Sequence, residues 1–264
     1  MTNDEYTAIK AVHFSGLKPL AVSPLLYHHR LAVPGEDKPA FALGSAAHCA
    51  ILEPDEFGKR YAEYAPVRNG KKWEEWQEKN PGVQSLKPHE MSRAQEIARA
   101  VRGHRIAGQL LRGGRAEEVV TWNDAVTGLA CKGRLDYLRP DFVTDLKTAR
   151  DPSPQAFAKV ASGLGYLAQV AFYHDGATAA RLIDGKQRPY IIAVESNEPF
   201  DVACFQLTDD ALLYGREFYR SLLRRLLECT EANYWPGVAP DLQELGISPY
   251  APDPYSTAEI GDDF

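Results

Sequence analysis

The run from Glu117 to Thr148 constrains the fold more than any other part of the chain, because strand-forming segments alternate there with turn residues. Residues 117–122 and 129–138 have the composition of two strands joined by a turn, and residues 142–148 have that of a third. Side chains alternate between the two faces of a strand. Three consecutive strands with short connections predict a β-sheet at the centre of the fold.

Two acids and one lysine lie in this run. Asp136 ends the segment Gly133-Arg134-Leu135-Asp136, and Asp145-Leu146-Lys147-Thr148 begins nine residues later. Alternation places Asp145 and Lys147 on one face of their strand. Converging carboxylates and a lysine suit metal-dependent hydrolysis of phosphodiesters, because the acids offer hard oxygen ligands to Mg²⁺ and the lysine orients or activates water and offsets developing charge. An isolated Asp-x-Lys could also be a charge pair on a surface hairpin, so other features of the sequence are needed to distinguish this from a metal site.

The remaining sequence predicts helices and further strands. Ser15 and Ser23 are helix-start signals, and residues 41–52 are small and apolar, as in a buried helix. We also expect a short helix at 73–79 within a loop over 65–90, a helix at 88–112, one or two helices at 153–174, strands at 189–195 and 201–207, and a helix capped by Thr208 that continues to Leu227. This order predicts a single α/β domain with a central mixed β-sheet flanked by helices.

Composition excludes several classes of protein. The chain has 264 residues, of which 44% are hydrophobic, and no run approaches the 18 or so consecutive apolar residues of a membrane span. Its acidic start lacks the layout of a signal peptide, so we expect a cytoplasmic protein. The four cysteines are scattered without a C-x-x-C pair, which disfavours a zinc or iron–sulfur site and indicates free thiols.

Charge is distributed unevenly. The net charge is −6, but no Lys or Arg follows Arg225, and that stretch carries eight of the 36 acids. All 30 basic residues therefore precede it, beside 28 acids. We expect residues 1–238 to form the folded domain, with local basic patches, and residues 239–264 to form an acidic, Pro-rich tail that is ordered only in part.

Three further patterns are weak when taken singly. Gly44-x3-His48 lies in the small-residue helix, where the glycine permits close packing and the imidazole faces inward. Glu117-Glu118 opens the strand before Asp136 and could bring an acid to the same metal. Gln169 and Tyr173 are four residues apart on one helix face and could hydrogen-bond a ligand or water.

Together these motifs resemble the PD-(D/E)XK nuclease superfamily in its RecB-like and lambda-exonuclease-like branch, and in particular RecE-like (exodeoxyribonuclease VIII) nuclease domains. The motifs in register are Gly44-x3-His48, the upstream Glu, Gly133–Asp136, Asp145–Thr148 and Gly165-Tyr166-x2-Gln169-x3-Tyr173. The resemblance runs from about residue 13 to Pro236 and implies a restriction-endonuclease-like fold.

The resemblance implies a metal site. Asp136 and Asp145 would be the central ligands, joined by the Leu146 carbonyl, and His48 would be a further ligand. The upstream acid is assigned to Glu117, with Glu118 left open. Mg²⁺ is the implied ion, and Mn²⁺ is possible.

It also implies roles for side chains that do not bind the metal. Lys147 would position the water or stabilise the pentavalent phosphate, and Gln169 and Tyr173 would support the scissile phosphate or the lysine. Two positions depart from the family pattern, because Leu135 stands before the first acid instead of proline and Thr144 before the second instead of glycine.

Basic residues outside the motifs are candidates for DNA contacts. Arg68, Lys71 and Lys72 lie in a glycine-containing loop before Trp73, where they could clamp or stack on a duplex end. A solvated loop with tryptophan anchors is the alternative. Arg30 is a candidate for binding a 5′-phosphate.

The family implies an activity and partners. Its members degrade one strand of duplex DNA 5′ to 3′ with Mg²⁺ as homo-oligomeric rings, trimers or tetramers, beside a RecT-like single-strand annealing protein. We therefore expect a RecE-like exonuclease of phage or prophage recombination that acts on double-stranded DNA ends. The alternatives are a related endonuclease, a single-strand exonuclease, and a non-enzymatic scaffold that binds DNA ends.

Overall fold

A five-stranded sheet in the order β3-β4-β5-β6-β7 forms the centre of the computed structural model, which describes residues 1, 3–33 and 39–247. The pair β5–β6 is parallel and the other neighbouring pairs are antiparallel. The strands are β3 (Arg115–Asn123), β4 (Ala130–Leu138), β5 (Val143–Ala149), β6 (Tyr190–Glu195) and β7 (Val202–Gln206). The prediction of one α/β domain with a central mixed sheet is confirmed.

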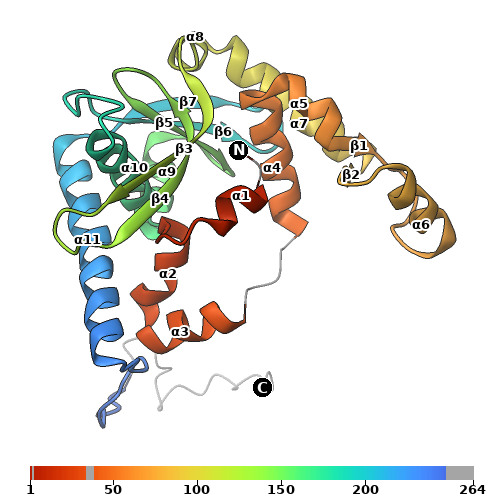
Figure 1. The fold of residues 1–264 in the computed structure, drawn as a ribbon. Helices are drawn as coiled ribbons and strands as arrows, with labels where there is room; N and C mark the ends of the chain where they lie inside the picture. Colours follow the sequence, from red (N-terminus) through yellow and green to blue (C-terminus); the bar gives the residue numbers. More distant parts are fainter. Residues whose placement is uncertain (2, 34–38, 248–264) are drawn as a thin grey trace, which may run out of the picture.

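Helices cover both faces of this sheet (Figure 1). One face packs against α2 (Phe14–Val22), α9 (Pro154–Gly163), α10 (Tyr166–Ala179) and α11 (Asp209–Ala232), and the other against α4 (Pro39–Leu52), α5 (Pro54–Arg60), α7 (Pro88–Gly103) and α8 (Arg105–Leu110). Strand β6 shows the division: Ile191 and Ala193 belong to the first core, and Ile192 and Val194 to the second. A strand buried on both faces needs a continuous apolar run, which β6 has.

Helix starts agree in part with the sequence. Ser23 caps α3 (Pro24–Ala32), with its hydroxyl accepting from the Leu26 N–H, and Thr208 caps α11. The expectation for Ser15 is wrong, because His13 is the cap of α2 and its Nδ1 accepts from the Gly16 N–H. The imidazole accepts a hydrogen bond from one of the N–H groups at the start of α2 that have no partner inside the helix, a role that serine often plays.

Several elements differ from the prediction. Helix α5 and the short α1 (Asn3–Ala8) were not expected, and the helix predicted at 88–112 breaks at His104 into α7 and α8. Helix α11 continues five residues beyond Leu227, to Ala232. The break near Gly163–Gly165 is confirmed, with Gly165 in a left-handed conformation (φ 72°) between α9 and α10.

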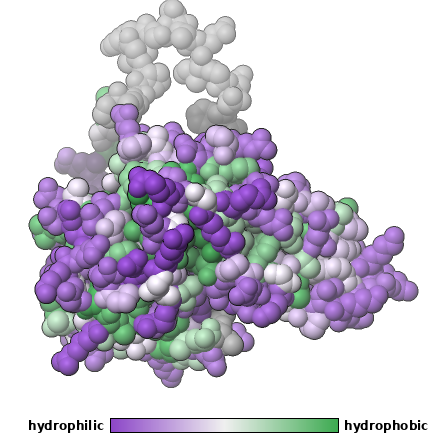
Figure 2. Space-filling model, turned by 90° about the horizontal axis from the view of Figure 1, so that it is seen from above, coloured by the Kyte–Doolittle hydropathy of each residue, from purple (hydrophilic) through white to green (hydrophobic). Residues whose placement is uncertain are grey.

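An arm projects from the body between α5 and α7 (Figure 1). It contains α6 (Gly70–Lys79), which confirms the short predicted helix, and two unpredicted strands, β1 (Tyr61–Glu63) and β2 (Gln84–Leu86), that pair in parallel. The arm is largely hydrophilic on the face seen in Figure 2. Three-residue strands lack a periodic pattern, so a sequence does not reveal them.

The segment after α11 returns to the body. The Trp235 ring stacks on Tyr27 and His28 of α3, with centroids 5.8 Å and 4.8 Å away, and the Leu25 N–H donates to the Pro236 carbonyl. Most of the tail predicted at 239–264 lies outside the described residues. In the described part of the chain, no helix has the length and apolar character needed to cross a membrane.

Gly215 of α11 lies close against the backbone of α10. A Cβ there would lie 2.9 Å from the Ala171 Cβ and closer still to the Leu167 carbonyl, which is backbone and cannot rotate away. We expect Gly215→Ala to lower the free energy of unfolding by about 1–3 kcal/mol, as overpacking does. Urea denaturation would measure the loss.

The matched control is Gly58→Ala in α5, where an added Cβ meets nothing within 4 Å. It should raise the free energy of unfolding by about 0.5–1 kcal/mol, because alanine is favoured over glycine inside a helix. Equal effects of the two changes would contradict the close contact between α10 and α11.

Candidate active site

Strands β4 and β5 separate soon after the turn that joins them. They pair only at Tyr137↔Thr144 and Leu138↔Val143. Beyond these pairs, the Asp136 carboxylate takes the place of a backbone partner, because its Oδ2 accepts from the Leu146 N–H at 2.7 Å. The N–H and C=O of a strand residue point to the same side, so the Leu146 carbonyl is also directed toward the β4 side.

His48 and Glu117 join Asp136 at this separation. One ligand atom of each residue lies within 4.8 Å of the other two, and His48 Nδ1 is 3.8 Å from Asp136 Oδ2. His48 comes from α4, Glu117 from β3 and Asp136 from β4. Two consecutive strands and a helix distant from them in the sequence thus place one imidazole and two carboxylates around a common point.

Glu117 reaches this point from an unusual backbone conformation. The register pairs Ala116 with Tyr137 and Glu118 with Leu135, so Glu117 lies opposite Asp136. Its φ is 51°, in the left-handed region that non-glycine residues rarely adopt. Its neighbour Glu118 is directed elsewhere and forms an ion pair with Arg115 at 3.1 Å. Of the two candidate acids, the structure places Glu117 beside Asp136 and His48.

Asp145 and Lys147 lie on the same face of β5, as alternation predicts. Lys147 Nζ is 2.6 Å from Asp145 Oδ2, and the Asp145 side chain is fully buried. Leu146 points the other way into the second core. Asp145 Oδ1 is buried and has no hydrogen-bond partner among the described residues. Asp145 is not part of the cluster of His48, Glu117 and Asp136, and it forms an ion pair with Lys147 instead.

Burial dominates the electrostatics of these groups. It raises the pKa of Glu117 to about 7, with the Asp136 charge adding to the shift. It also raises the pKa of Asp136 and of Asp145, although Lys147 opposes both shifts. For His48, burial and then Lys147 lower the pKa to about 4, which leaves the imidazole neutral at pH 7. A neutral imidazole offers a lone pair, as a metal ligand must.

Lys147 remains charged in this setting. Burial acts to lower its pKa, but Asp145 and Asp136 together outweigh burial and the pKa is raised. Its ammonium also lies 4.9 Å from the centroid of the Tyr166 ring, in a cation–π contact. The acids and the ring therefore hold a protonated lysine beside the carboxylates.

A cavity of about 820 Å³ opens onto these groups. Among the residues predicted for the site, His48, Glu117, Asp136 and Lys147 line it. The remaining lining residues are Lys18, Gly44, Ser45, Cys49, Glu53, Arg60, Tyr61, Arg134, Thr148, Leu164 and Tyr166.

None of these residues was predicted as a ligand, catalytic or DNA-binding residue, and Arg134, Lys18 and Tyr166 bear most on the chemistry of the site. Arg134 is two positions before Asp136 on β4, so alternation could have identified it. Tyr166 belongs to the motif Gly165-Tyr166-x2-Gln169-x3-Tyr173, in which only Gln169 and Tyr173 were given roles. Lys18 follows Ser15 by three residues, and that segment was interpreted only as the start of a helix. Arg134 also contacts the N-terminal helix, with its guanidinium carbon 4.6 Å from the Tyr6 ring centroid.

Gln169 and Tyr173 lie behind the cavity and do not line it. Gln169 Nε2 donates to the Tyr173 hydroxyl at 3.0 Å. The Tyr173 ring lies against β4, where a Cβ on Gly133 would be 2.9 Å from ring carbons. The glycine of the Gly133–Asp136 motif thus makes room for this ring. Gly44 has no comparable need, because a Cβ there would lie 3.8 Å from Thr148 Oγ1, an ordinary contact.

The predicted DNA-binding residues lie away from the acid cluster. Lys71 and Lys72 are exposed on α6, in the arm, and Arg30 is exposed on α3. Arg68 is held by the Ser85 carbonyl and by Glu90. Trp73 is half-buried, stacked on Trp76 with ring centroids 5.2 Å apart and 9° between the planes, and both rings contact Tyr64. The tryptophans therefore form the apolar centre of the arm.

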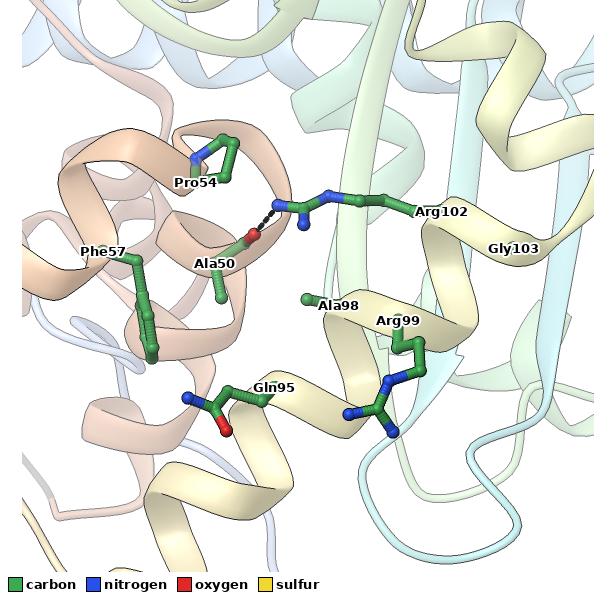
Figure 3. A pocket seen from close by; sticks show the side chains of 8 residues that line it. All are labelled: Ala50, Pro54, Phe57, Gln95, Ala98, Arg99, Arg102 and Gly103. Atoms are coloured by element: carbon green, nitrogen blue, oxygen red, sulfur yellow. Dashed lines mark hydrogen bonds between the residues drawn. The ribbon is translucent and has the colours of Figure 1, made fainter.

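A second cavity, of about 470 Å³, lies between α4–α5 and α7 (Figure 3). Arg102 crosses it to donate to the Ala50 carbonyl, and Arg99 lies at its edge. No acid is among the described residues that line it. It shares no residue with the cavity that holds Asp136.

The side chains and the carbonyl at this site can be compared with the ligands that a divalent metal prefers. Buried carboxylates and a backbone carbonyl are the hard oxygen donors that Mg²⁺ takes. The unpartnered Asp145 Oδ1 and the raised pKa values of Glu117 and Asp136 show negative charge that the protein itself does not compensate. The residues fit a divalent cation, and the neutral imidazole is a ligand that suits later first-row metals better than Mg²⁺.

The fold and the acid–lysine cluster define a nuclease domain of the PD-(D/E)XK type. A family model described as a PDDEXK-like domain of unknown function (DUF3799) matches residues 14–243, so the chain belongs to this family. The resemblance inferred from the sequence motifs is thereby confirmed at the level of the PD-(D/E)XK nuclease superfamily, and the chain is a nuclease.

One solved structure shares this fold over most of both chains. A candidate exonuclease from Eubacterium rectale is similar over 88% of this chain and 87% of its own, with 16% identity and a TM-score of 0.63. A structure of LHK-Exo in complex with dAMP matches over 71% of this chain and 89% of its own, with 15% identity and a TM-score of 0.32, too low to support an argument. Among curated proteins, none matches this sequence.

Metal binding should depend on pH through Glu117. The pKa of this carboxyl is about 7, and a bound metal needs the carboxylate, so below pH 7 a proton competes with the metal. We expect affinity for Mg²⁺ to fall about tenfold for each pH unit below 7. The Mg²⁺-induced rise in Tm should therefore be larger at pH 8 than at pH 6.

Two variants test whether the pH dependence of Mg²⁺ binding comes from Glu117 itself. Glu117→Gln should weaken the Mg²⁺ effect and remove much of its pH dependence, whereas Glu118→Gln, which changes the acid paired with Arg115, should leave both unchanged. Equal Mg²⁺ affinity of the wild type at pH 6 and pH 8 would contradict a role for Glu117.

Proposed function

We propose that the chain is a Mg²⁺-dependent, RecE-like exonuclease that acts on double-stranded DNA ends. It degrades one strand 5′ to 3′ and leaves 3′ overhangs for homologous recombination in a phage or prophage. The observation that carries the proposal is the joint presence of His48, Glu117, Asp136 and Lys147 in one cavity, with Asp145 beneath the lysine. Motif order and the PD-(D/E)XK family support the exonuclease reading.

The residues of the site would divide the chemistry. His48, Asp136, Asp145 and the Leu146 carbonyl, with Glu117, would hold the ion, Mg²⁺ or alternatively Mn²⁺. The ion supplies Lewis-acid activation of the attacking water and neutralises charge on the phosphate.

Lys147 has a role of its own in this proposal. Its ammonium is fixed by Asp145 at 2.6 Å and by the Tyr166 ring, so it can donate a hydrogen bond to the attacking water or to a phosphate oxygen without prior rearrangement. Gln169 and Tyr173 would fix the position of α10 against β4 behind the site. They would support Lys147 indirectly, since neither lines the cavity.

The proposed partners follow from the same family. We propose that the protein works in the cytoplasm as a homo-oligomeric ring, trimeric or tetrameric, beside a RecT-like single-strand annealing protein. Truncation after Pro236 would show whether the acidic C-terminal segment takes part in binding the annealing protein or in limiting DNA affinity.

The proposal is tested with linear duplex DNA labelled at the 5′ or the 3′ end, and with closed circular DNA. With Mg²⁺, the wild type should release 5′-labelled mononucleotides, spare circles and stop in EDTA. Lys147→Ala should lower the rate at least about 100-fold, the scale seen when a group that stabilises transition-state charge is removed. Lys186→Ala, which removes an exposed lysine, should have no effect.

Other results identify the alternatives. Cleaved circles would indicate an endonuclease, and degradation of single strands alone would indicate a single-strand exonuclease. DNA that the wild type and Lys147→Ala both bind without cutting would indicate a scaffold for DNA ends.

We also propose that Lys71 and Lys72 contact the duplex from the arm. Both are exposed on α6 and form no ion pair with other described residues. Replacing both by alanine should weaken DNA binding equally for all sequences and reduce the slope of log K against log salt by about 1–2. Fluorescence anisotropy in a salt series would measure it, with Lys79→Ala as the control on the same helix.

A further inference from the structure

The cavity contains a second lysine. Lys18 lies on α2, half-buried, and lines the same cavity as Lys147. Its ammonium is 5.9 Å from the Tyr166 ring centroid, and the Lys147 ammonium is 4.9 Å from the same centroid. One aromatic ring therefore contacts two ammonium groups, one from α2 and one from β5.

Lys18 is not paired directly with an acid. Among the described residues its ammonium forms no ion pair and no hydrogen bond, and its contacts are the rings of Tyr166 and of Phe14, 5.6 Å away. Burial lowers its pKa and repulsion from Lys147 lowers it further, while the charge of Asp145 opposes both effects only in part. A half-buried ammonium without a paired acid is partly desolvated at a cost, which binding of an anion would offset.

The local structure fixes where this ammonium lies. Phe14 and Lys18 are one turn apart on the same face of α2. Phe14 is buried in the first core and lies 3.6 Å from the position of a Cβ on Gly165. The stem of Lys18 therefore lies along a fixed aromatic surface, and only the ammonium is free to meet a ligand in the cavity.

Charge complementarity identifies the ligand. Lys147 is engaged with Asp145, and Arg60 with Glu53. The basic side chains of the cavity that have no ion pair among the described residues are Lys18 and Arg134. An anion that approaches the acids would be stabilised by both ammonium groups and would relieve their mutual repulsion. In a nuclease cavity the available anion is a backbone phosphate.

We propose that Lys18 is a phosphate-binding residue of the substrate site, which contacts a phosphodiester of the nucleic acid beside the acid cluster. This inference rests on the nuclease function and does not depend on the direction of degradation. Lys18 contributes to substrate binding, whereas Lys147 acts on the reacting phosphate. The two lysines should therefore differ in their effects on KM and kcat.

The test compares Lys18→Met, Lys18→Arg and Lys186→Met in the full chain. Methionine keeps the apolar stem on Phe14 and Tyr166 and removes the charge, and arginine keeps the charge. Lys186 is exposed, with 86% of its side chain accessible, and lies outside the cavity, so its variant controls for net charge. Thermal unfolding of each variant would show that the fold is retained.

Two measurements test whether Lys18 binds a phosphate of the substrate. Steady-state digestion of duplex DNA with Mg²⁺ should show KM about tenfold higher for Lys18→Met with kcat nearly unchanged, the loss of one charged hydrogen bond. Anisotropy of a labelled duplex in EDTA, in a salt series, should show the slope of log K against log salt reduced by about 0.7–0.9, the contribution of one phosphate. Lys18→Arg should restore most of both values.

The outcomes separate this inference from the proposed function. A KM and a salt slope equal to those of the wild type, or equal changes in Lys186→Met, would overturn the role of Lys18. A loss of kcat with unchanged KM would also overturn it, because Lys18 would then act on the reacting phosphate. A wild type that degrades no nucleic acid would overturn the proposed function itself.

Discussion

The early separation of β4 from β5 is the constraint on which the site depends. Only two residue pairs join these strands, and the Asp136 carboxylate occupies the position where the ladder would continue. A regular ladder would fill this space with backbone hydrogen bonds and leave no room for a substrate. The start of β4, which does not pair with β5, is covered by the N-terminal segment. Val12 forms a bridge with Cys131, and Lys132 Nζ donates hydrogen bonds to the Tyr6 and Ile9 carbonyls.

The energetics of the site are those of a protein that keeps uncompensated charge for function. Buried carboxylates are unfavourable unless they are paired, and Lys147 pairs with one of them while the others carry raised pKa values. Glu117 adds backbone strain at φ 51°. Such strain costs on the order of 1–3 kcal/mol and concentrates at functional sites. The packed helices on both faces of the sheet offset these costs.

The sequence predicted what depends on local pattern and missed what depends on tertiary contact. The five strands of the sheet, the Ser23 and Thr208 caps and the shared face of Asp145 and Lys147 follow from periodicity and capping chemistry. The cavity lining by Lys18 and Tyr166 depends on how α2 and α10 pack, which no local pattern records. The His13 cap was missed because serine is the usual capping residue. The left-handed Glu117 was missed because the strand around it is otherwise regular.

The contacts that complete the site join distant parts of the chain, and this has a consequence for how the protein folds. The bond from Lys132 to the Tyr6 carbonyl spans 126 residues, and the bond from Arg225 on α11 to the Leu20 carbonyl on α2 spans 205. Contacts of such long range slow folding, because loop closure precedes the gain from packing. A nascent chain that has not yet released α11 cannot fix α2 or Lys18. The nuclease site is therefore completed only after α11 has been synthesised and packed against α2.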